Sequence, residues 1–208
     1  INRLNEILLQ NLREEIIYKK RKEEIIKINS RFQKRNNLIE VTNKNIFKKY
    51  PYALFEIFLV MQQNPSIVGV RVSTIRLIRK YLYLIDNNFR NNLINKSLFL
   101  EIIRQPNLVG HKLRLMHKYG ILGAYMPSFS KIEGLMQFDL FHIFTVDEHI
   151  LRVIRNLRLF STDEYKNKYP ICYPLIKTIT KLELLYLAGL FHDIATVSYT
   201  HLRAHETR

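Results

Sequence analysis

The chain has 208 residues, 47% of them hydrophobic and 25% charged, which suffices to bury a core and excludes wholesale disorder. A net charge of +15 admits nucleic acid as a partner, but the basic residues are scattered along many expected helices, so charge alone does not favour it. The single cysteine, Cys172, excludes an internal disulfide and a cysteine-based zinc cluster.

The low numbers of glycine and proline, six each, are few for a sandwich or barrel of short strands, so we expect an all-α fold. Apolar residues recur at steps of four near the start of the chain and predict one long helix: Leu4, Leu8, Leu12 and Ile16. A basic run at residues 19–22 lies among helix-spaced isoleucines, including Ile25 and Ile26, and is expected to be a solvated helix face. Between Ser30 and Thr42 this periodicity breaks, which indicates a turn with a short extended piece.

Several further helices follow in chain order. Ser73 has the residue type of an N-cap, and Asn87 with Asn88 marks the expected end of its helix. Gly120 is expected to end a later helix in a left-handed conformation. The other helices are expected from Pro51 to Pro65, from about Phe89 to Arg104, and from Pro106 onward. The one plausible boundary between domains lies near residues 128–140, where the helical pattern is interrupted.

The next helix carries the first candidate site residue. Thr145 followed three residues later by Glu148 fits a capping box, so a helix should begin there. His149 borders its apolar face, and a histidine in such a position is more often a satisfied core residue than a ligand.

A second apolar helix runs directly into two ionisable residues. The residues from Leu184 to Phe191 are followed by His192 and Asp193, and burying such groups unpaired costs several kcal/mol. Adjacent helical residues point about 100° apart, so the two side chains converge more readily on a third object than on each other. The spacing leaves two interpretations open, a bound metal ion or a structural pair. The same apolar run is far shorter than a membrane span, and we expect a cytoplasmic protein without membrane contact.

Together, His149 and the pair His192 and Asp193 resemble the first half of an HD-domain metal-dependent phosphohydrolase. Longer stretches resemble the family of bacterial PII uridylyltransferase/uridylyl-removing enzymes. They are FQKRNN at 32–37, VRVSTIRLIR at 70–79, FLEIIRQP at 99–106, YGILG at 119–123, FDLFH at 138–142, TVDEH at 145–149 and LLYLAGLFHDIA at 184–195.

This resemblance implies an order of domains. The family has a nucleotidyltransferase domain, a helical region, an HD domain and two ACT domains that sense glutamine. Residues 1–130 would be the helical region and 131–195 the N-terminal part of the HD domain, so we interpret the chain as a central fragment. The Asp-x-Asp signature of the transferase is absent from the sequence. Residues 196–208 do not match the family and are expected to be an artefactual tail, although His201 and His205 have a spacing at which helical histidines can share zinc.

The resemblance also implies chemistry. The HD domain would remove UMP from uridylylated PII with a divalent metal, Mg²⁺ or Mn²⁺, held by His149, His192 and Asp193. His142, seven residues before His149, is a candidate either for a residue that supports the ligands from behind or for a structural role. The parent enzyme would act on PII and its uridylylated form, use UTP, release UMP and respond to glutamine, whereas the fragment alone should be inactive.

Two other functions remain open from the residues. The first is a non-catalytic basic helical module that binds nucleic acid or an acidic partner. The second is an HD phosphohydrolase of a free nucleotide, which the HD residues alone would permit.

Overall fold

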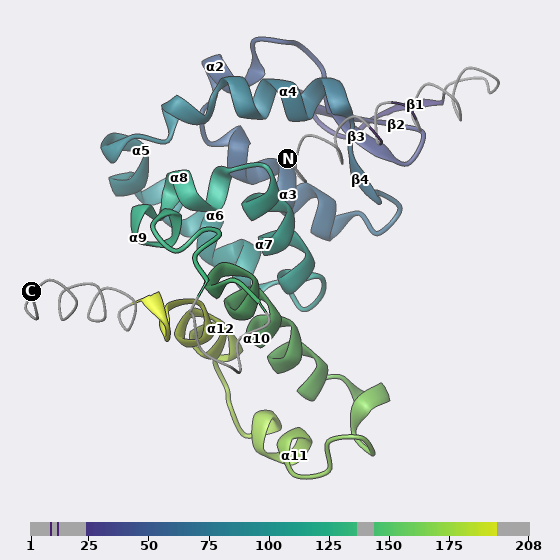
Figure 1. The fold of residues 1–208 in the computed structure, drawn as a ribbon. Helices are drawn as coiled ribbons and strands as arrows, with labels where there is room; N and C mark the ends of the chain where they lie inside the picture. The colour runs from purple at the N-terminus through teal and green to yellow at the C-terminus, as the bar shows by residue number, and fades with distance from the viewer. Residues whose placement is uncertain (1–8, 10–11, 13–23, 137–143, 195–208) are drawn as a thin grey trace, which may run out of the picture. The chain divides into compact units, whose positions relative to one another are not determined.

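The structure is a computed structural model that describes Leu9, Leu12 and residues 24–136 and 144–194 (Figure 1). Most of the described residues are helical, but a small sheet is also present. Backbone contacts divide the chain into two compact units: Ile1–Phe99 with Lys118–Ile121, and Leu100–His117 with Leu122–Arg208. The expected division into functional regions at residue 130 stays a prediction, because compactness alone does not define it.

The expectation of an all-α fold is confirmed only in part, because the chain is mostly helical but its first unit also contains a four-stranded sheet. Its strands are β1 (Ile25–Lys27), β2 (Phe32–Arg35), β3 (Leu38–Val41) and β4 (Gly69–Val70), in the order β1-β2-β3-β4. The first two pairings are antiparallel and the pairing of β3 with β4 is parallel. Ile25 and Ile26 therefore belong to a strand and not to the expected helix, whereas Leu12 is helical.

The low number of glycines did not predict the sheet, because an asparagine and not a glycine makes the tight turn of its hairpin. Asn36, between β2 and β3, has a φ of 53°, a left-handed conformation that asparagine tolerates better than most residues. The expected turn with an extended piece is thus a complete hairpin. Phe32 and Ile39 are fully buried on it, while Glu40 forms ion pairs with Arg35 and Arg71.

The helices between the hairpin and residue 104 supply the core of the first unit. The expected helix after Pro51 is α3, whose aromatic residues Phe55 and Phe58 are fully buried. Ser73 is not an N-cap, since its helix begins one residue earlier, and Asn87 starts a new short helix instead of ending one. The elements are α2 (Ile46–Lys49), α3 (Ala53–Gln63), α4 (Val72–Lys80), η1 (Leu82–Leu84), α5 (Asn87–Asn91) and α6 (Leu93–Arg104).

After α6, all regular elements among the described residues are helices, joined by turns and loops. Gly120, with a φ of 86°, follows α7 and ends it as expected. The elements are α7 (Val109–Lys118), α8 (Ile121–Tyr125), α9 (Pro127–Ser130), α10 (Val146–Phe160), η2 (Asp163–Tyr165), α11 (Cys172–Lys177) and α12 (Leu182–Phe191). None of the helices in the described part of the chain has the length and hydrophobicity that crossing a bilayer requires.

Candidate metal centre

Helices α10 and α12 lie against each other and carry the candidate site at one end. Helix α10 is amphipathic, and its residues Ile150 and Ile154 are fully buried. Gly189 permits the close approach of α12, because a Cβ there would lie 3.1 Å from Leu157 Cδ1 and 3.5 Å from Val153 Cγ1. The packing of these helices therefore sets the positions of the side chains at their ends.

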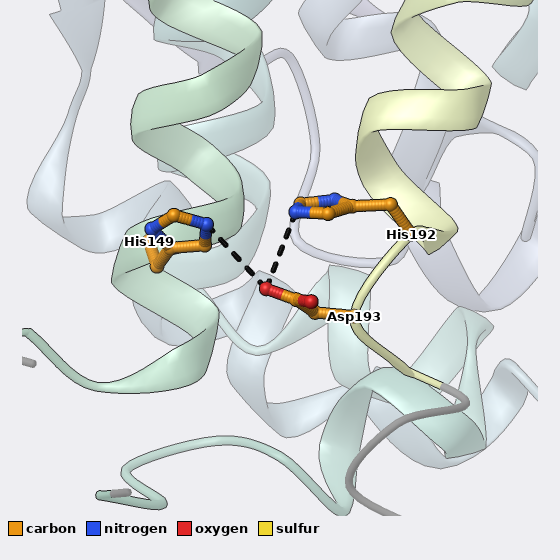
Figure 2. A group of neighbouring side chains, drawn as sticks. All are labelled: His149, His192 and Asp193. Carbon is orange, nitrogen blue, oxygen red and sulfur yellow. Dashed lines mark ion pairs between the residues drawn. The ribbon is translucent and has the colours of Figure 1, made fainter. Parts of the chain in front are cut away.

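The three residues expected at the site come together, as Figure 2 shows. The Nε2 atom of His149, from the second turn of α10, lies 3.4 Å from Asp193 Oδ2. The Nε2 atom of His192, just after α12, lies 3.2 Å from the same oxygen. One donor atom from each residue lies within 4.8 Å of the other two, so the expected convergence is confirmed. The three side chains are 30–41% exposed, which leaves the cluster open to solvent.

A hydrogen bond fixes which nitrogen of His192 faces the cluster. The Nδ1 atom of His192 lies 2.8 Å from the carbonyl oxygen of Gly189, and a carbonyl can only accept, so Nδ1 must carry hydrogen. In the neutral ring, Nε2 then presents its lone pair to the Asp193 carboxylate at 3.2 Å. Two lone pairs in this position repel each other unless a proton or a cation lies between them.

The donors suit a divalent metal ion. Two imidazole nitrogens and one carboxylate oxygen form a mixed set that magnesium, manganese, zinc and iron accept with different affinities. Ligand atoms about 2.1 Å from one ion are roughly 3 to 4 Å apart, close to the separations from Asp193 Oδ2. The hydrogen bond behind His192 is typical of metal-binding histidines, whose second nitrogen is held by another group. The residues therefore fit the ion that the sequence resemblance implies.

A second cluster of a histidine with carboxylates lies at the start of α10, where it is almost closed to solvent. The Nε2 atom of His117 lies 3.0 Å from Asp147 Oδ2, and its Nδ1 atom lies 3.4 Å from Glu133 Oε1. Burial raises the pKa of Asp147, but hydrogen bonds from His117, Thr145 and the Gly134 backbone outweigh it and lower this pKa to about 2. This buried cluster anchors the helix that carries His149.

The bond from Thr145 corrects one local prediction. Thr145 is the N-cap of α10, but its side chain makes no capping bond and instead bonds to Asp147. Glu148 is equally diverted, because its Oε1 atom accepts from Arg114 and Arg152. The helix begins where expected, but the capping box does not form.

No motif in the sequence marks His117, Glu133 or the arginine pair around Glu148 as functional. His117, Glu133 and Arg114 lie in separate segments with no recognisable spacing, so only the tertiary structure brings them to their partners on α10. Arg152 follows Glu148 by four residues, a spacing at which helical side chains can pair. His142, His201 and His205 lie outside the described residues.

Comparisons with known proteins show which family and which relatives this chain is similar to. Residues 32–125 match the family described as uridylyltransferase GlnD third domain. Three relatives are each called a bifunctional uridylyltransferase/uridylyl-removing enzyme. That of Nitrosococcus oceani is 55% identical over 93% of this chain, that of Hydrogenovibrio crunogenus 50% over 94%, and that of Pseudomonas aeruginosa 47% over 94%.

The chain spans only 22% of the length of each of these three relatives. No solved structure matches it at a significant level. High identity nevertheless extends over nearly all of this chain and includes the third-domain match. The chain therefore belongs to the family of bifunctional uridylyltransferase/uridylyl-removing enzymes and corresponds to about a fifth of the length of such a protein.

Proposed function

We propose that this chain supplies part of the uridylyl-removing site of a bifunctional enzyme, in which a divalent ion serves the hydrolysis of uridylylated PII. The observation that carries the proposal is the arrangement of His149, His192 and Asp193, with Nε2 of His192 directed at the carboxylate of Asp193. The names of the relatives support the uridylyl-removing activity, and the HD resemblance supports its assignment to these residues.

Each residue has a distinct part in this proposal. Asp193 supplies the negative charge that attracts the ion, and its Oδ2 atom is the point on which both imidazoles converge. His192 is held by Gly189 in the tautomer that can bind a metal through Nε2. His149 fixes the ion to α10. The ion, Mg²⁺ or Mn²⁺, would act as a Lewis acid towards a phosphoryl oxygen and would acidify a water molecule.

The wider assignment follows the family. The full enzyme would transfer UMP from UTP to PII in a different domain, remove it at this site, and respond to glutamine through ACT domains. Cytoplasmic PII and its uridylylated form would be the partners. The third-domain match at residues 32–125 supports this assignment over hydrolysis of a free nucleotide, which the three ligands alone would equally permit.

The test uses a full-length enzyme that carries this segment. We expect His192→Ala and Asp193→Ala each to reduce uridylyl removal to background, because each removes one of three ligands, and to leave uridylyl transfer nearly unchanged. Asp163→Ala is a matched control, since this carboxylate is 80% exposed and is not among the three ligands. Loss of transfer with retained removal would show that these residues serve the other activity.

The isolated chain provides a second measurement. Because it offers three ligands and the family completes its site with residues further along the chain, we expect weak Mn²⁺ binding in calorimetry and no release of UMP from uridylylated PII. Binding to arbitrary DNA that weakens with salt and survives His149→Ala and His192→Ala would instead favour a basic interaction module.

A further inference from the structure

A pair of arginines lies beside the candidate metal centre and shares a single carboxylate. Glu148 Oε1 accepts from Arg114 Nη1 at 3.1 Å and from Arg152 Nε at 3.2 Å. The side chains of the two arginines are 41% and 42% exposed. We call Arg114 and Arg152 the arginine pair, and Glu148 is the carboxylate that they share.

The helix places this group next to the proposed ligands. Glu148 immediately precedes His149, and Arg152 follows His149 by three residues, a separation at which helical side chains are neighbours about 5–6 Å apart at Cβ. Val153, Ile154 and Leu157 are the α10 residues nearest to Gly189 of α12. With about 100° per residue, Arg152 lies on the side of His149 away from these residues, where α12 does not cover it.

The charges of the group do not cancel. Two guanidinium groups face one carboxylate, so the group has one excess positive charge. Arg152 donates its hydrogen bond to Glu148 from Nε, and its guanidinium carbon lies 3.7 Å from the centre of the Phe144 ring. The ring supports the guanidinium from one side and so limits its rotation. Among the described residues, the side-chain hydrogen bond of Arg152 comes from Nε, which leaves its terminal nitrogens to donate elsewhere.

We propose that Arg114 and Arg152 bind the phosphate group of the nucleotidyl substrate and of the nucleoside monophosphate product, with Glu148 orienting both arginines. A planar guanidinium presents paired N–H groups that match two phosphate oxygens, and such charged hydrogen bonds are among the stronger ones in proteins. The inference rests on the proposed function, because it takes the substrate phosphate to lie at the ion held by His149, His192 and Asp193.

The decisive experiment measures UMP as an inhibitor of uridylyl removal in a full-length enzyme that carries this segment. We expect Arg152→Met to raise the inhibition constant of UMP and the KM for uridylylated PII about 10-fold, since it deletes one charged hydrogen-bonding group. Arg152→Lys retains the positive charge without the paired N–H groups of the guanidinium and should give an intermediate increase in both constants. Arg155→Met is the matched control, because Arg155 is an exposed arginine on the same helix, and its effect should stay within about 2-fold.

Glu148→Gln separates phosphate binding from a merely structural role. If the arginines only pair with Glu148, this variant should resemble Arg152→Met. If they bind phosphate, the amide oxygen of the glutamine can still accept from both arginines and orient them, and loss of the competing charge should leave the inhibition constant of UMP unchanged or lower. Mn²⁺ affinity should stay within about 3-fold in every arginine variant, because none of them removes a ligand.

Two failures are distinguishable. An unchanged inhibition constant in Arg152→Met, with removal still abolished by His192→Ala, would overturn the arginine pair as a phosphate site and leave the proposed function standing. Retained removal in His192→Ala would overturn the proposed function itself.

Discussion

Helix α10 takes part in two clusters of histidine with carboxylate that have opposite arrangements. In the candidate metal centre, two imidazoles converge on one oxygen of Asp193. In the buried cluster, the single imidazole of His117 lies between Asp147 and Glu133. The first arrangement collects lone pairs at one point that solvent can reach, whereas in the second each nitrogen of one histidine faces a different carboxylate. Residue types alone therefore do not identify a metal site; the direction and the availability of the lone pairs do.

The largest expected effect tests the structural role of the buried cluster. His117→Ala should lower the free energy of unfolding by about 3–5 kcal/mol, because it leaves the buried Asp147 carboxylate without its main partner. Urea unfolding of the chain measures the change. His192→Ala should cost less than about 1 kcal/mol, since His192 is exposed and its pair with Asp193 is open to solvent. Equal losses in the two variants would remove the distinction between the clusters.

A buried charge that lacks ion-pair partners should destabilise the folded chain, in contrast to the hydrogen-bonded carboxylate of Asp147. Lys112 on α7 is 1% exposed, makes no ion pair among the described residues, and its pKa is lowered by burial to about 8. The folded chain thus binds this proton more weakly than the unfolded chain, whose lysine has a pKa near 10.5. The charge therefore costs up to about 3 kcal/mol below pH 8, and the cost disappears as the pH rises towards 10.5.

Lys112→Met should accordingly stabilise the chain by up to about 3 kcal/mol at pH 7, with a smaller gain at pH 10. Urea unfolding at the two pH values tests this expectation. A variant that is less stable than the original chain at pH 7 would mean that the ammonium group of Lys112 is well satisfied in the folded state. The contrast with Asp147, whose hydrogen bonds outweigh its burial, would then lose its basis.

The smallest expected effect concerns the contact that positions the metal centre. Gly189→Ala adds a methyl group 3.1 Å from the flexible end of Leu157, but alanine favours a helix over glycine by about 1 kcal/mol. We expect the two effects to cancel to within about 1 kcal/mol in thermal unfolding. Ala188→Gly, at the exposed neighbouring position, should lose about 1 kcal/mol because only the helix preference changes. A loss above 2 kcal/mol in Gly189→Ala would mean that Leu157 cannot move aside.

The convergence of the three candidate ligands could be predicted because its signal is local. An apolar helix that ends in His192 and Asp193 is unusual in itself, and His149 lies at the edge of another apolar stripe. Once both stripes are buried against each other, the residues at the helix ends come together. The buried cluster gives no such signal, because His117 and Asp147 are 30 residues apart and meet only through tertiary packing.

The sheet was missed for a different physical reason. Its strands have two to four residues, too few for an alternating pattern to differ from a helical one, and the pair Ile25 and Ile26 fits either. Asn36 replaces the glycine that would have marked the hairpin. The capping box failed because the carboxylate of Asp147 offered Thr145 a different bond.

Three consecutive residues in the first turns of α10 face three different neighbours. Asp147 contacts His117, Glu148 contacts the arginines, and His149 faces Asp193. Each residue of a helix is rotated by about 100° from the one before it. Insertion of one residue before this segment would bring Glu148 to the position of the imidazole opposite Asp193, and deletion of one residue would bring Ile150 there. The spacing of this segment should therefore tolerate no change in length, even where individual side chains can be exchanged.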